Sequence, residues 1–158
     1  MFKLTTLALL LACTAAAFHA PVHAQQAKPT QSAVASPAVK SGRMAINGVE
    51  YYYEVQGQGE PLLLLHGGLG SIDMFRPLLP ELTEGRQVIA VDLQGHGRTA
   101  LGDRPFRLES MGDDMAAIVE RLGHDQVDVF GYSLGGGVAL RMALQKPDSV
   151  RRLALAST

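Results

Sequence analysis

The chain has 158 residues, and its 14 lysines and arginines against 15 aspartates and glutamates give a formal net charge of −1. Hydrophobic residues make up 47% of the sequence and charged residues 18%, which is typical of a globular domain and excludes an intrinsically disordered chain. Because no basic excess can neutralise a phosphate backbone, we expect no nucleic-acid partner. The single cysteine, Cys13, excludes an intramolecular disulfide, a CxxC redox pair and a thiolate zinc cluster.

The first 24 residues have the layout of a secretory signal peptide. Lys3 precedes a mostly apolar run over residues 4–12, and Ala24 occupies a cleavage position before Gln25. A transmembrane anchor is the alternative, but a proline breaks the uncharged stretch and no charged stop follows it, so we expect no stable membrane span. We expect cleavage after Ala24 and a bacterial protein that is periplasmic or secreted.

A lipid anchor at Cys13 is a second interpretation of the same segment. The sequence Leu10-Leu11-Ala12-Cys13 resembles the lipobox of bacterial lipoproteins, in which the cysteine becomes the lipidated first residue. Either processing route takes the protein out of the cytoplasm.

A linker and then a hairpin are predicted after this leader. Residues 25–42 are rich in Gln, Ser, Ala and Pro and lack hydrophobic periodicity, which is typical of a flexible tether. Residues 43–158 form the predicted domain. It opens with Asn47-Gly48, a strong hairpin signal, followed by an alternating pattern over residues 49–56.

Short apolar runs then alternate with segments of helical periodicity. The runs that predict buried strands are residues 61–65, 88–91, 127–130 and 150–155. The segments that predict helices are residues 71–83, 108–122 and 134–145, of which the first is interrupted by two prolines. This order predicts an α/β fold, a hairpin followed by a mostly parallel sheet flanked by helices. In such sheets ligands lie beyond the carboxyl ends of the strands, just after Leu65, Val91 and Phe130.

A G-x-S-x-G motif follows the third of these strands. Gly131 and Gly135 flank Ser133 at the point where the chain must reverse from strand to helix, which forces the serine into a strained backbone region and exposes its Oγ. The start of the following helix supplies a positive dipole end and unpaired N–H groups. Ser133 is the predicted nucleophile, and the N–H of Leu134 is a predicted oxyanion donor.

The second oxyanion donor is predicted on the loop after the first parallel strand. Leu65 is followed by His66-Gly67-Gly68, and the glycines allow the backbone to approach a bound carbonyl group. We expect the N–H of Gly68 to supply this donor.

Phosphate and metal sites are disfavoured by residue spacing. Residues 97–102 carry glycines at P-loop spacing, but Asp103 occupies the position that requires lysine. The spacing of His66, His96 and His124 does not match metal ligands, so we expect no metal.

Residues from about Asn47 to Ser157 resemble the N-terminal half of an α/β-hydrolase. Three motifs carry the resemblance in the family's order: LLLLHGG, VIAVDLQGHGRT and VDVFGYSLGGGVAL. The sequence is similar to bacterial esterases and enol-lactonases related to cofactor-free haloperoxidases. The resemblance implies hydrolysis of a small-molecule ester, thioester or lactone through an acyl-serine intermediate, without a cofactor.

Several polar residues near the motifs are predicted to be structural. The resemblance gives His66 a role in hydrogen bonding the oxyanion loop rather than in proton transfer. Asp92 and Arg98 are expected to brace the turn after their strand, and His124 to lie in a surface turn.

The acid and the histidine of a catalytic triad are missing from the sequence. In this family they follow the serine in chain order, but the residues after Ser133 contain one acid, Asp148, and no histidine. Asp148 is expected in a turn, at the end of the helix that leads away from the serine. Because a serine without a base is a poor nucleophile, we expect the 158-residue chain to be inactive. We also expect the strand at 150–155 to present an apolar edge where the C-terminal strands of the fold are missing.

Two classes of function remain open. In the first, a longer product is a serine hydrolase, marked by an Asp and a His encoded downstream of Thr158; a perhydrolase or acyltransferase would use the same serine. In the second, the 158-residue chain is a non-catalytic interaction module or a remnant. Dehalogenase and epoxide hydrolase branches, which use an aspartate nucleophile, are disfavoured because position 133 is serine. Acyl specificity and oligomeric state are not predicted.

Overall fold

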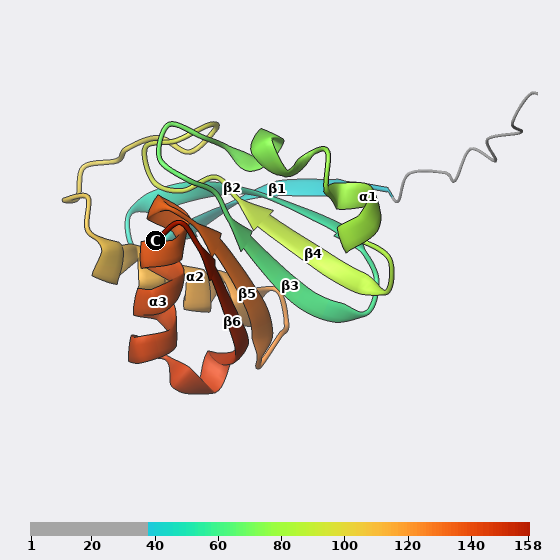
Figure 1. Cartoon of the computed structure of the whole chain (residues 1–158). Coiled ribbons are helices and arrows are strands. Elements are labelled where there is room, and N and C mark those ends of the chain that lie inside the picture. The colour runs from blue at the N-terminus through green and yellow to red at the C-terminus, as the bar shows by residue number, and fades with distance from the viewer. Residues whose placement is uncertain (1–37) are drawn as a thin grey trace, which may run out of the picture. The chain divides into compact units, whose positions relative to one another are not determined.

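Six strands form one mixed sheet in the computed structural model, which describes residues 38–158 (Figure 1). The strands in chain order are β1 (Lys40–Ile46), β2 (Val49–Gly57), β3 (Glu60–Leu65), β4 (Arg86–Val91), β5 (Val127–Tyr132) and β6 (Val150–Ala156). Across the sheet their order is β1-β2-β4-β3-β5-β6. β2 runs antiparallel to both of its neighbours, whereas β4, β3, β5 and β6 are mutually parallel. This confirms the predicted hairpin followed by a parallel sheet.

Helices cover parts of both faces of the sheet. They are η1 (Ile72–Phe75), α1 (Leu79–Leu82), α2 (Leu108–Arg121), α3 (Leu134–Gln145) and η2 (Pro147–Ser149). α2 and α3 lie together on one face, while η1 and α1 lie on the other (Figure 1). The predicted helix over residues 134–145 is confirmed at both ends, and the segment with two prolines forms only the two short turns η1 and α1.

The opening hairpin turns at Asn47-Gly48, as predicted. Both residues have positive φ, 46° and 85°, which is the requirement of the type I′ turn that matches strand twist. β1 begins at Lys40, so residues 40–42, which the sequence assigned to the linker, belong to the sheet. The reason is that β2 is nine residues long and offers them partners, beginning with the pair of Lys40 and Val55.

The apolar strand β3 is buried on both faces. Leu63 and Leu65 pack with residues of α2 and α3, whereas Leu62 and Leu64 pack against η1 and α1. This explains why the sequence of β3 is apolar throughout instead of alternating. Because β3 lies between β4 and β5, the loops that follow these three strands meet at one end of the sheet.

Several predictions concern residues 1–37, which lie outside the described part of the chain. They are the signal peptide with its cleavage site, the lipid anchor at Cys13 and most of the linker. Within residues 38–158, no helix is long and apolar enough to cross a membrane.

Candidate active site

Ser133 lies at the turn between β5 and α3, where its side chain is exposed. Its backbone has φ 49° and ψ −114°, a conformation that a residue with a side chain adopts only at an energetic cost. The strand before the serine and the helix after it hold it there. The structure therefore places Ser133 on the strained turn that the motif predicts.

The two glycines of the motif allow α3 to start against the end of β3. A Cβ added at Gly135 would overlap the backbone carbonyl of Leu65 and come within 2.6 Å of the carbonyl of His66. A Cβ at Gly131 would overlap the carbonyl of Gly135 in the first turn of α3. Since these obstacles are backbone atoms, a side chain at either position would have to push the elements apart.

The loop after β3 lies directly beside the Ser133 turn. A Cβ added at Gly67 would lie 3.4 Å from the Cβ of Ser133, and one added at Gly68 would lie 4.0 Å from the Cβ of Leu134. The N–H groups of Gly68 and Leu134 donate no hydrogen bond to any other group of residues 38–158. The two predicted donors are thus neighbours with free protons, next to the positive end of a twelve-residue helix.

His66 is buried and uses both ring nitrogens to hold this loop. Nδ1 lies 2.7 Å from the carbonyl oxygen of Gly67, and Nε2 accepts the N–H of Leu93 at 3.0 Å. The proton therefore resides on Nδ1, and burial lowers the pKa of the imidazole, which keeps the ring neutral. With its only acceptor nitrogen occupied, His66 is not placed to take a proton from Ser133, in agreement with its predicted structural role.

Asp92 and Arg98 brace the turn after β4, as predicted. The buried carboxylate of Asp92 accepts the N–H of Ile72 at 2.7 Å and both the backbone N–H and the Nε–H of Arg98, at 2.8 and 2.7 Å. The carboxylate also fills the space beside Gly97, where a Cβ would overlap it. These bonds connect the loop after β3 with the loop after β4.

A second buried ion pair, between Asp114 and Arg104, was not predicted. Asp114 of α2 is fully buried and pairs with Arg104; it also accepts the hydroxyl of Tyr51 at 2.6 Å and the amide of Asn47 at 2.8 Å. Burial, followed by the bond to Asp114, raises the pKa of Tyr51 far above its ordinary value. The signal in the sequence was an acidic residue on the apolar face of α2, three residues after Met111.

Neither His96 nor Asp148 is placed to act as the base for Ser133. Nδ1 of His96 lies 2.9 Å from the carbonyl of Gln94, and its ring centroid lies 5.4 Å from that of His66. Asp148 is exposed in η2, at the far end of α3, about 18 Å along a twelve-residue helix. Within residues 38–158, the Ser133 hydroxyl has no hydrogen bond to a histidine or a carboxylate.

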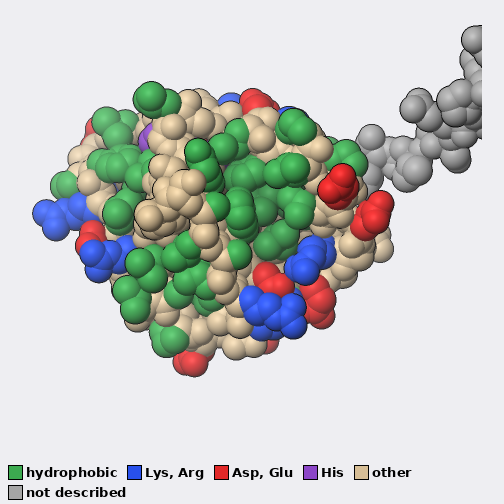
Figure 2. Space-filling model, in the orientation of Figure 1, with side chains coloured by type: hydrophobic (Ala, Val, Ile, Leu, Met, Phe, Trp, Pro, Cys, Tyr) green, Lys and Arg blue, Asp and Glu red, His purple; other side chains and the backbone are tan. Residues whose placement is uncertain are grey.

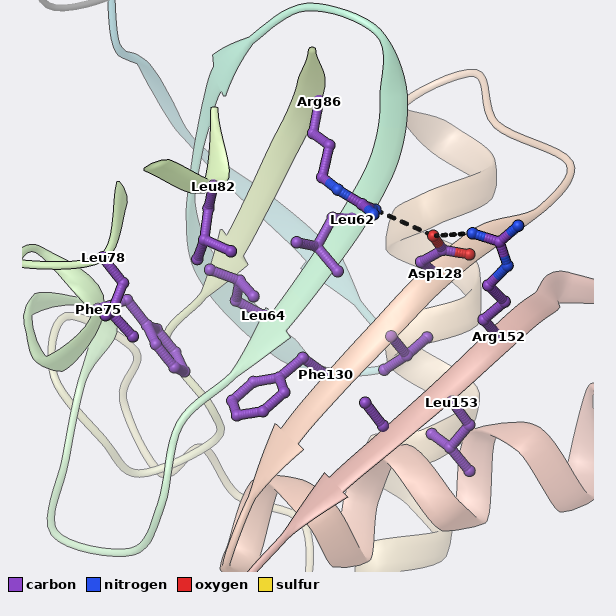
Figure 3. Close-up of a pocket in the computed structure, with 12 residues that line it drawn as sticks. Leu62, Leu64, Phe75, Leu78, Leu82, Arg86, Asp128, Phe130, Arg152 and Leu153 are labelled. Carbon is purple, nitrogen blue, oxygen red and sulfur yellow. Dashed lines mark hydrogen bonds and ion pairs between the residues drawn. The ribbon is translucent and has the colours of Figure 1, made fainter. Parts of the chain in front are cut away.

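An apolar hollow of about 490 Å³ opens on the sheet face beside η1 and α1 (Figure 3). Its lining residues come from β3, η1, α1, β4, β5 and β6 and from the turn before α1; among them are Leu64, Phe75, Phe130 and Leu153. None of them belongs to the Ser133 turn or to residues 66–71, which directly follow β3. We therefore place the candidate active site at the ends of the strands and not in this hollow.

An exposed serine on a strained strand-to-helix turn, with two free amides beside it, defines the class of α/β proteins built around a nucleophile elbow. A family model described as alpha/beta hydrolase fold matches residues 60–158. The chain belongs to this family, which confirms the fold class expected from its motifs.

Relatives of this chain include hydrolases of more than one kind and an acetyltransferase component of an acetoin cleaving system. The chain is 40% identical over 108 residues to the soluble epoxide hydrolase of Corynebacterium sp. (strain C12), an alignment that covers 68% of this chain and 38% of the relative. It is also 40% identical over 95 residues to the pimeloyl-(acyl-carrier protein) methyl ester esterase of Neisseria meningitidis (serogroup C, strain FAM18), covering 60% of this chain and 35% of the esterase. The chain thus spans less than half the length of these relatives.

A solved structure of a hydrolase is also similar to this chain. The epoxide hydrolase CorEH superposes with a TM-score of 0.69 at 36% identity, over 75% of this chain and 42% of that protein. The likeness therefore covers most of the described residues and a part of the neighbour's fold.

Proposed function

We propose that this chain carries the nucleophile of a serine hydrolase that cleaves a carboxylic ester, thioester or lactone. The observation that carries the proposal is the strained, exposed Ser133 beside the free amides of Gly68 and Leu134. The name of the esterase relative supports an ester substrate, and the family supports hydrolysis as the reaction class.

The proposed reaction follows from these groups. The Ser133 Oγ attacks the substrate carbonyl carbon while a base accepts its proton, and the carbonyl electrons move onto oxygen. The N–H groups of Gly68 and Leu134 stabilise this oxyanion. Collapse of the intermediate breaks the bond to the alcohol or thiol, which leaves with a proton, and water then hydrolyses the acyl-serine.

The base of this reaction is proposed to come from outside the described residues. Within residues 38–158, His66 is neutral and fully hydrogen bonded, and His96 contacts the carbonyl of Gln94. The family order of serine, acid and histidine places both partners after the nucleophile, and the relatives have more than half of their length outside the matched region.

Epoxide opening is the less favoured reaction, although one relative is named an epoxide hydrolase. A serine that attacked an epoxide carbon would form an ether, which water does not cleave under mild conditions. An acyl-serine ester can be hydrolysed, so a serine at position 133 fits a carbonyl substrate better.

A fluorophosphonate labelling experiment tests the proposal. The probe is applied to the 158-residue chain and to a version joined to the sequence encoded downstream of Thr158. We expect labelling of the longer version only, because the labelling reaction requires both Ser133 and an external base. Labelling should disappear in Ser133→Ala and persist in the control Ser149→Ala, whose serine lies at the far end of α3.

Other outcomes of the labelling experiment separate the parts of the proposal. Labelling that survives in Ser133→Ala, or no labelling of either version, would contradict the serine hydrolase. Labelling of the 158-residue chain at Ser133 would keep the nucleophile but contradict the external base.

A non-catalytic interaction module is the second candidate. Two observations favour it within residues 38–158: Ser133 has no base beside it, and the apolar outer edge of β6 pairs with no other strand. Absence of labelling in every version, together with binding through β6, would support this candidate.

A further inference from the structure

The proposed oxyanion donor, the N–H of Gly68, belongs to the peptide group that joins Gly67 to Gly68. The carbonyl oxygen of Gly67, at the other end of this group, lies 2.7 Å from Nδ1 of His66 and accepts the N–H of Gly70 at 3.1 Å. A peptide group is planar and trans, so its N–H points away from its carbonyl. The two bonds at the carbonyl therefore fix the direction of the Gly68 N–H.

Gly67 also contacts a side chain that takes no part in these bonds. Its φ is not positive, so its backbone conformation does not require glycine. A Cβ added at Gly67 would instead lie 2.8 Å from Cδ1 and 3.0 Å from Cε1 of Tyr132. The aromatic ring thus packs directly on the Cα of Gly67 and occupies the space that a side chain would need.

Tyr132 is held in place by β5, of which it is the last residue. It pairs with Ala156 of β6, whose carbonyl oxygen accepts the N–H of Ser133 at 2.8 Å. Because side chains alternate along a strand, Tyr132 points to the same face of the sheet as Phe130, where Figure 2 shows hydrophobic side chains gathered. The ring therefore projects from a fixed backbone that leads directly into the nucleophile.

The ring lies between the loop after β3 and the strand that carries Ser133. Both hydrogen bonds at the Gly67 carbonyl come from residues of the loop itself, so they fix the shape of the loop and not its distance from Ser133. Without the ring, the loop would be free to move into the vacated space, and the Gly68 N–H would shift relative to the substrate oxygen. A misplacement of about 1 Å can lower a rate by about a hundredfold.

We propose that Tyr132 is a positioning residue of the oxyanion hole, whose ring, packed on Gly67, holds the Gly68 N–H at its working distance from Ser133. This role rests on the proposed function, because it requires Ser133 to react with a carbonyl or a related group. The contact uses the ring and not the hydroxyl group. Tyr132→Phe should therefore keep the role, and Tyr132→Ala should lose it.

The rate of labelling at Ser133 tests this role in the version of the chain that is joined to the sequence encoded downstream of Thr158. A fluorophosphonate is compared with the same probe carrying sulfur in place of its phosphoryl oxygen, since sulfur is a weak hydrogen-bond acceptor and gains little from the oxyanion donors. Tyr132→Ala should slow labelling by at least about tenfold with the oxygen probe and by less with the sulfur probe. Tyr132→Phe should label like the wild type with both probes.

A second contact between a glycine and a tyrosine supplies the matched control. A Cβ added at Gly42 would lie 2.8 Å from the hydroxyl oxygen of Tyr53, its cross-strand neighbour in the opening hairpin. Tyr53→Ala makes the same change of side chain in a hairpin that holds no part of the proposed site. It should leave the ratio of the two labelling rates unchanged.

A second variant covers the case that Tyr132→Ala does not fold, which circular dichroism would reveal. Gly67→Ala keeps the ring and adds a methyl group that must push the loop away from it, so it should also slow labelling more with the oxygen probe than with the sulfur probe. An unchanged ratio of the two rates in Gly67→Ala would contradict the role of the contact.

The remaining outcomes separate this role from the proposed function. Tyr132→Ala that labels as fast as the wild type would overturn the role of the ring. So would an equal loss with both probes, or Tyr132→Phe that labels as slowly as Tyr132→Ala. A wild-type protein that is not labelled at Ser133 would overturn the serine hydrolase itself, and the role of Tyr132 with it.

Discussion

Single residues at the site divide into those that can act on a substrate and those that hold others in place. Ser133 and the amide of Leu134 face the open end of the sheet, while His66 has both ring nitrogens engaged within the fold. His66 lies two residues before Gly68, the proposed oxyanion donor, and a histidine at that position could be taken from the sequence for a catalytic base. Its burial and its bonds exclude that role, because a base needs a free acceptor nitrogen.

The neutral state of His66 predicts a pH dependence of stability. Its pKa in the folded chain is lowered below the unfolded value of about 6.5, so its contribution to stability is complete above that pH. As the pH falls, the unfolded chain binds a proton that the folded chain resists. The free energy of unfolding should then decrease by up to about 1.4 kcal/mol per pH unit from this group.

Urea unfolding near pH 7.5 and near pH 5.5 measures this effect. His66→Gln, which can still donate and accept a hydrogen bond, should lose less stability between the two pH values than the wild type. His124→Gln, in the turn after α2, serves as the control and should behave like the wild type. Equal pH dependence in the wild type and His66→Gln would contradict the assignment of a buried neutral ring.

At the scale of elements, the site depends on three loops that meet where β4, β3 and β5 end. The loop after β4 is connected to the loop after β3 by Asp92, and to α2 and β2 by the pair of Arg104 and Asp114. These contacts cross from one element to another. They fix loops that have little regular structure of their own.

The buried pair predicts a large loss of stability when one member is removed. Arg104→Met leaves the carboxylate of Asp114 buried without its cation and should lower the free energy of unfolding by about 3 kcal/mol. The double variant Arg104→Met and Asp114→Leu should lower the free energy of unfolding by less than the sum of the two single variants. Urea unfolding of the four proteins of this cycle measures the coupling.

An exposed ion pair between α2 and α3 provides the matched control. Arg141 and Glu109 lie 3.1 Å apart with side chains about half exposed, so Arg141→Met should change the free energy of unfolding by less than about 1 kcal/mol. If Arg104→Met and Arg141→Met lowered the free energy of unfolding by similar amounts, the prediction that burial makes the first pair more important for stability would be contradicted.

For the whole molecule, we propose that residues 1–24 are a leader that exports the protein. Residues 1–37 lie outside the described structure, so export is proposed from the sequence alone. We expect a bacterial host to cleave after Ala24 and to release a protein that begins at Gln25.

Intact-mass spectrometry of the protein from periplasmic and membrane fractions tests this proposal. A mass that corresponds to Gln25 as the first residue would support the signal peptide, and a lipidated Cys13 would support the lipoprotein. Recovery of the uncleaved chain in the membrane would contradict both and indicate an anchor.

Features that depend on neighbours along the chain could be predicted from the sequence. The turn at Asn47-Gly48 requires positive φ at adjacent residues, and α3 is bounded by Ser133 and Pro147, so local sterics place both elements. The same reasoning identified Ser133 and its flanking glycines. Such features are set by residues that lie close together in the sequence.

Contacts between residues that are distant in the sequence could not be predicted in this way, because they follow from the packing of the whole fold. The strand order places β3 between β4 and β5, and this brings Gly68 beside Leu134 and His66 against the amide of Leu93. The partner of Asp114 and the exposure of β6 likewise depend on how helices and strands pack. Residues far apart in sequence are joined by burial and hydrogen bonding across the sheet, and neither is encoded in a local periodicity.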